Sequence, residues 1–141
     1  MRAVVTRVTR ASVSVDGVVI GRIDEPGLLV LLGVTHSDGA QEVEKMGRKL
    51  HEIRALRDEE SCATSGAPLL VVSQFTLYGS TRKGRRPSWT DAARPEQAEP
   101  LLEAVVEDLR ARGARVETGR FAAMMAVESV NDGPFTLLVD V

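Results

Sequence analysis

The chain has 141 residues and a formal net charge of −2, which fits one ordinary domain and is too short for two enzymatic domains. Hydrophobic residues make up 43% of it and charged residues 27%, values that are typical of a folded globular protein and exclude a disordered one. No apolar run is long enough to cross a bilayer and no secretory signal opens the sequence, so we expect one domain over residues 1–141, cytoplasmic and without membrane attachment.

Cysteine and histidine are too few for several common chemistries. Cys62 stands alone, which excludes an internal disulfide framework, and with only two histidines the chain cannot build a structural zinc site of the CxxC type. We therefore expect no metal and no cofactor. The negative net charge also argues against a general nucleic-acid binder, so any RNA contact has to come from a local basic patch.

The N-terminal third is predicted to be rich in strands. Residues 2–9 and 12–16 alternate apolar and polar side chains, as a strand with one buried face does, and Asp16-Gly17 then forms a tight turn into a second strand over 18–23. Residues 28–34 are apolar almost throughout, which is typical of a central strand that is covered on both faces.

Two helices are predicted in the rest of the chain. The first follows a cap at Ser37 or Asp38 and has apolar residues three or four apart from Val43 to Ile53. The second starts at Pro95 or only at Pro100 and ends at Gly113. Between the helices we expect a loop over 58–68, a buried strand over 69–77 and a basic loop over 78–91. Three strands follow, over 116–121, 125–130 and 135–141.

This order of elements predicts an α/β fold in which a layered, mixed β-sheet of barrel-like form carries two main helices. Asn131 to Pro134 is predicted to be a hairpin turn between the last two strands, and the local pattern alone favours trans peptide bonds there. Because aromatic residues make up only 4% of this small chain, burying a further face against a second copy would be favourable, so we expect a homodimer.

The standard catalytic motifs GxSxG, HExxH and GxGxxG do not occur. The loop Gly79–Arg86 lacks the Lys-Ser/Thr pair that a phosphate-binding P-loop needs after its second glycine, and His36 and His51 each stand alone. An isolated histidine is more often a surface residue than a catalytic base, so no histidine triad is indicated.

Two segments can have either a structural or a functional explanation. Hydroxyl and amide groups appear abruptly at the end of the apolar run, in Ser73-Gln74-Phe75-Thr76, where they either bond to neighbouring backbone or form part of a site. Four cations in five residues, Arg82, Lys83, Arg85 and Arg86, either form a solvated loop or bind phosphates, and Trp89 beyond them either anchors the loop or stacks on a base.

Five blocks of sequence carry a resemblance that covers nearly the whole chain. They are MRAVVTRVTRASVSVDG, LLVVSQFTLYG, TRKGRRPSW, ETGRF and VNDGPFTLL. In this order they resemble the D-aminoacyl-tRNA deacylase family, and SQFTL followed later by NDGP is specific to it. The resemblance implies a homodimeric hydrolase that cleaves the ester between a D-amino acid and the 3′-terminal adenosine of tRNA, removes glycine mischarged on tRNA for alanine, and rejects L-aminoacyl-tRNA.

The resemblance also implies roles for particular residues. The catalytic pocket would be lined by Ser73, Gln74, Phe75 and Thr76. A cis peptide between Gly133 and Pro134 would enter the pocket of the partner subunit, with Arg7 bracing it, and Phe121 and Met125 would help to hold the terminal adenosine. The chain departs from the family at three places. Segment 57–68 is short and lacks a Lys-Met-Asn stretch. Met124 stands where an acidic residue is usual, and Thr6 stands where glutamine is frequent.

The mechanism stays open at this point. An aminoacyl ester is already activated, so backbone N–H groups near Phe75 and Thr76 could stabilise the oxyanion while water or the ribose 2′-hydroxyl completes the reaction. The rival within the same class is Thr76 as a covalent nucleophile, for which no activating base is apparent. The competing classes are a non-catalytic RNA-binding module that uses the basic loop and Trp89, and a general esterase.

Overall fold

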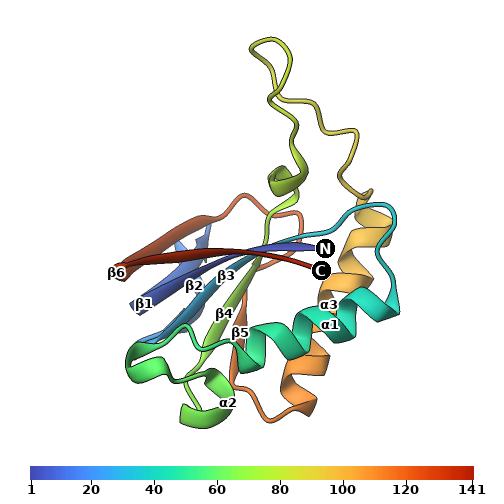
Figure 1. Ribbon diagram of the computed structural model, residues 1–141. Coiled ribbons are helices and arrows are strands. Elements are labelled where there is room, and N and C mark those ends of the chain that lie inside the picture. Colours follow the sequence, from blue (N-terminus) through green and yellow to red (C-terminus); the bar gives the residue numbers. More distant parts are fainter.

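The computed structural model describes residues 1–141 as a curved, mixed sheet with two long helices against one of its faces (Figure 1). The elements in chain order are β1 (Arg2–Val15), β2 (Val18–Ile23), β3 (Gly27–Gly33), α1 (Ala40–Glu52), the 3₁₀ helix η1 (Arg57–Glu59), α2 (Cys62–Ser65), β4 (Leu69–Ser73), the 3₁₀ helix η2 (Phe75–Tyr78), α3 (Pro95–Ala111), β5 (Val116–Thr118) and β6 (Ala126–Asp140). The predicted α/β class and the two main helices are confirmed. No helix is long and apolar enough to span a bilayer.

The long strand β1 organises the sheet. Its first half pairs with β3 and its second half with β2, while β6 runs antiparallel along its other edge. Strands β3, β4 and β5 are parallel, because α1 and α3 carry the chain back across the sheet between them. This gives the order β2-β1-β3-β4-β5, with β6 paired to β1.

Each face of the central strands is buried in a different apolar cluster. Leu28, Val30 and Leu32 belong to the larger cluster, which α1 and α3 cover, whereas Leu29 lies in the smaller cluster between the curved strands. Strand β4 alternates in the same way. The prediction of a central strand covered on both faces is therefore confirmed.

The sheet is nearly closed where β2 meets β5. A Cβ atom at Gly21 of β2 would lie 2.4 Å from the carbonyl oxygen of Thr118 in β5 and 3.3 Å from Cγ1 of Val13. Only a residue without a side chain allows the two strand backbones to come this close. The barrel-like form therefore depends on glycine at position 21.

We expect Gly21→Ala to lower the free energy of unfolding by about 1–3 kcal/mol, since the added methyl group has to push β5 away from β2. Urea unfolding measures this loss. Arg22→Ala on the same strand removes an exposed side chain and should change stability by less than about 0.5 kcal/mol. Equal midpoints for the two variants would contradict the close contact.

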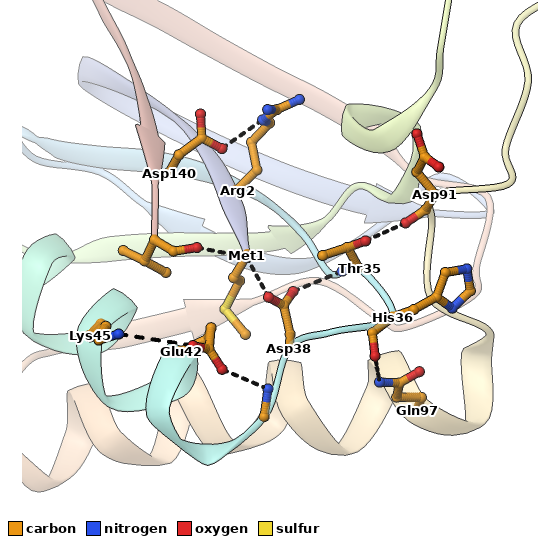
Figure 2. A network of polar contacts seen from close by, with 12 residues as sticks. Met1, Arg2, Thr35, His36, Asp38, Glu42, Lys45, Asp91, Gln97 and Asp140 are labelled. Atoms are coloured by element: carbon orange, nitrogen blue, oxygen red, sulfur yellow. Dashed lines mark hydrogen bonds and ion pairs between the residues drawn. The ribbon is translucent and has the colours of Figure 1, made fainter.

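A polar network joins the start of β1 to the end of β6 and the loop before α1 (Figure 2). The carboxylate of Asp38 accepts hydrogen bonds from the ammonium group of Met1 at 2.6 Å and from the Thr35 N–H at 2.8 Å, and Met1 also donates to the carbonyl oxygen of Val141. The buried Asp38 is thus fully paired, and it ties the β3–α1 loop to the start of β1 and, through Met1, to the end of the chain after β6.

Two predicted element boundaries are wrong in the first two thirds of the chain. Strand β4 ends at Ser73 and not at Leu77, because the backbone turns at Gln74 (φ −145°, ψ 80°) and enters η2. The predicted loop 58–68 contains η1 and α2, and α2 forms because Ser61 caps it by accepting from the Thr64 N–H. Of the two starts predicted for the second long helix, Pro95 is confirmed, since a proline at the first helical position loses no hydrogen bond, and Pro100 lies inside α3.

The predicted end of the chain also needs correction. Strand β5 stops at Thr118, and residues 119–125 leave the sheet. The hairpin turn predicted at Asn131 is wrong, because the segments before and after it both pair with β1 in one continuous strand, β6. Between the pairs Val8–Asn131 and Thr6–Thr136 the extra residues of β6 form a bulge, in which the Gly133–Pro134 peptide bond is cis, as the resemblance implied.

Candidate active site

A cavity of about 600 Å³ opens where β4 ends. Its walls come from the ends of β3 and β4, the first turn of η2, one face of α3, and residues 121–127. Five of the residues expected in the site line it, namely Ser73, Gln74, Phe75, Phe121 and Met125. They are brought together because residues 119–125, after leaving β5, pass over the end of β4.

The cavity is almost entirely apolar. Fifteen of its 18 lining residues are hydrophobic, and no lining residue is an aspartate, glutamate, histidine, lysine, arginine, cysteine or tyrosine. The side-chain polar groups in the lining are those of Ser73 and Gln74, together with the indole N–H of Trp89. Any reaction here must therefore depend on positioning and on backbone groups rather than on an ionisable side chain.

Two backbone donors lie at the start of η2. Phe75 and Thr76 are the first two residues of η2, so their N–H groups have no partner within that helix, whereas the neighbouring Gln74 N–H donates to the carbonyl oxygen of Leu32 at 2.8 Å. Phe75 is 56% exposed, and its ring meets Trp89 edge-on with 5.3 Å between centroids. Free donors at the cavity rim can bind an oxyanion of the substrate.

Thr76 itself lies outside the cavity lining. Its hydroxyl accepts a hydrogen bond from the side-chain amide of Gln74, and no basic side chain contacts it. A hydroxyl without a base is a weak nucleophile at neutral pH. The arrangement thus favours a role for the backbone at position 76 over a role for the side chain.

Other candidate nucleophiles and bases lie elsewhere. Cys62 is buried in the core, and burial raises the pKa of its thiol to about 12, so the reactive thiolate does not form at neutral pH. His36 lies within hydrogen-bond distance of the Thr90 carbonyl oxygen, 2.7 Å from Nε2, and neither it nor His51 lines the cavity. No group of three or more potential metal ligands is present.

The Gly133–Pro134 bulge does not line this cavity. It is held from two sides: Nε of Arg7 donates to the carbonyl oxygen of Asp132 at 2.8 Å, and the Asn131 side chain bonds to the N–H and the carbonyl oxygen of Phe135. The Arg7 guanidinium also lies over the Phe135 ring at 4.5 Å. Arg7 therefore contacts the bulge as the resemblance implied.

A second arginine that the sequence did not single out also holds the bulge. Arg57, in the short segment before α2, donates from Nε and Nη2 to the two carboxylate oxygens of Asp132 at 3.0 and 2.6 Å. These hydrogen bonds, with the positive charge of Arg57, lower the pKa of the Asp132 carboxyl below its ordinary value. A paired Arg and Asp 75 residues apart leave no local sequence signal, so spacing could not have revealed this contact.

The chain thus carries two separate features, a cavity with two backbone donors at its rim and an exposed bulge that Arg7 and Arg57 hold. Around the cavity mouth and along β6, apolar side chains are open to solvent, with Met124 91% exposed and Val127 40% exposed. Exposed apolar area of this kind marks a binding or association surface.

The family model for D-Tyr-tRNA(Tyr) deacylase matches residues 4–140. A D-aminoacyl-tRNA deacylase of Thermobifida fusca (strain YX) is 64% identical over all 141 residues, covering both chains completely, and one of Kineococcus radiotolerans is 61% identical over 140 residues, 99% of each chain.

Solved structures share the fold. A c-Myc DNA Unwinding Element Binding Protein superposes with a TM-score of 0.93 at 39% identity, covering 100% of this chain and 99% of the other. A probable eukaryotic D-amino acid tRNA deacylase, at 17% identity, superposes with a TM-score of 0.86 over 99% of this chain and 98% of its own. Sequence and fold together define the protein as a hydrolase of the deacylase class. It belongs to the D-Tyr-tRNA(Tyr) deacylase family.

Proposed function

We propose that the protein, as a single catalytic domain, hydrolyses the ester bond of D-aminoacyl-tRNA and releases free D-amino acid and tRNA. The observation that carries this proposal is the cavity in which Ser73, Gln74 and Phe75 meet Phe121 and Met125, in a chain that belongs to a deacylase family. Its volume of about 600 Å³ lies in the range of small-molecule sites, and its apolar walls suit an adenosine base.

In the proposed reaction the terminal adenosine enters the cavity and the ester carbonyl oxygen faces the free N–H groups of Phe75 and Thr76. A water oxygen attacks the carbonyl carbon, and the N–H groups stabilise the oxyanion that forms. The bond from the carbonyl carbon to the ribose 3′-oxygen then breaks, and that oxygen takes up the proton that the attacking water loses, delivered by way of the 2′-hydroxyl. Positioning an ester that is already reactive replaces the missing acid–base side chains.

Selection by chirality is proposed to need a second copy of the chain. The bulge is exposed and lies outside the cavity of its own chain, and apolar side chains such as those of Met124 and Val127 surround the cavity mouth. In a homodimer, the bulge of one protomer can enter the cavity of the other. Carbonyl groups of Gly133 and Pro134 would bind the α-amino group and occupy the side-chain position of an L-residue, while glycine on tRNA for alanine would pass.

The decisive experiment incubates the purified protein with D-Tyr-tRNA and with L-Tyr-tRNA and follows release of tyrosine. We expect rapid hydrolysis of the D-ester and none of the L-ester above the uncatalysed rate. Binding of tRNA with both esters left intact would identify an RNA-binding module instead. Cleavage of small esters as fast as D-Tyr-tRNA would identify a general esterase.

The contact between Arg57 and Asp132 gives a prediction about the bulge. Arg57→Gln is expected to reduce kcat/KM for D-Tyr-tRNA by about tenfold. Without the Arg57–Asp132 contact the bulge shifts, and a small displacement of a group that positions the substrate slows catalysis. Arg57→Lys should recover part of the loss, since lysine keeps the charge but not the paired geometry. Steady-state kinetics at pH 7 measures both.

Arg54→Gln is the matched control, because Arg54 is an exposed neighbouring arginine whose side chain forms no hydrogen bond in the structure. Its kcat/KM should stay within twofold of the unmodified protein. A tenfold loss in both variants would show a general charge effect and would refute the positioning role of Arg57.

A further inference from the structure

Residues 81–87 form a projecting loop, here named the basic arm, that extends away from the sheet and helices between η2 and α3 (Figure 1). The two legs are joined at their base by paired hydrogen bonds between the backbones of Ser80 and Ser88, at 2.8 and 2.9 Å. At the tip, Gly84 has a φ of +71°, which allows the chain to reverse. The arm is therefore a hairpin-like extension with a defined root.

The charge of the arm is uncompensated. Arg82, Lys83, Arg85 and Arg86 are all exposed, and none of them takes part in an ion pair or a side-chain hydrogen bond. The whole chain has a net charge of −2 with these four cations included, so the remainder is acidic. A positive projection on an acidic body concentrates a local field that attracts an anion.

The root of the arm is fixed to the rim of the cavity. Phe75, just before the arm, and Trp89, just after it, both line the cavity and contact each other. A Cβ at Gly79 would lie 2.6 Å from the Trp89 ring, so the ring packs directly on the backbone of the incoming leg.

The outgoing leg is tied down as well (Figure 2). The Thr35 hydroxyl donates to the carbonyl oxygen of Asp91 at 2.5 Å, and Nε2 of His36 lies 2.7 Å from the carbonyl oxygen of Thr90. The arm thus has a fixed direction at its root relative to the cavity, although its tip has no contact with the body.

We propose that the basic arm binds the phosphate backbone of the nucleotides that precede the terminal adenosine of tRNA. This inference rests on the proposed function, because an adenosine in the cavity leaves the adjoining phosphates at the rim where the arm begins. Each leg of about three residues reaches roughly 10 Å, enough to follow the strand as it leaves the cavity. Arginine side chains bind phosphate oxygens through paired hydrogen bonds, and such contacts carry no sequence information.

The test compares D-Tyr-tRNA with 3′-O-D-tyrosyl-adenosine, which keeps the ester and the terminal adenosine but lacks the phosphates and all other nucleotides of the tRNA. For the double variant Arg85→Ala/Arg86→Ala we expect KM for D-Tyr-tRNA to rise by about tenfold or more with kcat little changed, and the slope of log KM against log salt to decrease by about one to two. Hydrolysis of tyrosyl-adenosine should be unchanged. The control Arg48→Ala/Lys49→Ala removes the same charge from exposed positions on α1 and should leave both substrates unaffected.

A fluorescence titration with tRNA that carries no amino acid separates failure of this inference from failure of the proposed function. Weaker binding by the arm variant and not by the α1 variant supports the arm as the phosphate-binding element, even if neither ester is cleaved. Equal tRNA binding and equal KM in the arm variant and the unmodified protein would overturn it. An equal loss in both double variants would also overturn it, because it would trace binding to overall charge.

Discussion

Replacing Phe75 with proline is expected to lower the single-turnover rate of D-Tyr-tRNA hydrolysis about 10²–10³-fold below that of Phe75→Ala, the usual effect of deleting one oxyanion donor. Both variants lose the aromatic ring and its contact with Trp89, so their difference isolates the backbone N–H. Phe75 is the first residue of η2, where proline fits, and Gln74 before it has a non-helical conformation that a following proline tolerates.

Thr76→Ala completes this experiment, because it removes the hydroxyl and keeps the N–H. We expect its rate to stay within a few-fold of the unmodified protein. Near-complete loss of activity in Thr76→Ala, with equal rates for Phe75→Pro and Phe75→Ala, would identify the threonine as nucleophile and refute the backbone mechanism. Thermal unfolding of all three variants checks that η2 remains folded.

The spacing of apolar residues predicted correctly those strands and helices whose side chains are buried in the core. Residues 28–34 are apolar almost throughout, and the structure places alternate side chains in two clusters because both faces of β3 are covered. Helix α1 follows from the spacing of Val43, Met46 and Leu50, which all face the core. In these segments the hydrophobic pattern alone determines which side is buried, so local sequence is sufficient.

The spacing of apolar residues did not predict the backbone conformation where contacts with distant parts of the chain determine it. The bulge in β6 looked like a hairpin turn because Asn131-Asp132-Gly133-Pro134 is typical of one, yet both flanking segments are held by the same partner strand. The side chains of Arg7 and Arg57 that hold the bulge come from distant parts of the chain. Pairing across more than 70 residues leaves no trace in a single sequence, so only the family resemblance pointed to the bulge.

Part of the candidate site was likewise predicted before the structure and part was not. The resemblance indicated Ser73, Gln74, Phe75, Phe121 and Met125, and the structure brings these five together around one cavity. The free N–H groups of Phe75 and Thr76 could not be read from residue types, because they result from the turn of the chain at Gln74. The chemistry that we propose therefore depends on backbone geometry more than on side-chain identity.

Gly133→Ala is expected to reduce kcat/KM for D-Tyr-tRNA about 100-fold, because the bulge cannot keep its shape with a side chain at this position. A Cβ atom there would lie 2.5 Å from the backbone nitrogen of Phe135 and 2.9 Å from its Cβ. The bulge is exposed, so global stability should change little. The ratio of D- to L-ester hydrolysis should fall as well, because the proposed chiral barrier is displaced.

Gly39→Ala is the matched control, since a Cβ at Gly39 meets nothing closer than 3.9 Å. Its activity and its D/L ratio should match those of the unmodified protein. A Gly133→Ala variant that keeps full activity and full discrimination would show that the bulge is not part of the site.

Mixing two inactive variants tests whether the site is shared between protomers. A heterodimer of Phe75→Pro and Gly133→Ala protomers has one site with both defects and one site with an intact cavity and an intact bulge, provided that each bulge enters the cavity of the other chain. Random exchange of protomers should therefore restore about a quarter of the original activity. If each chain formed its site alone, every site in the mixture would carry one defect, and no activity would return.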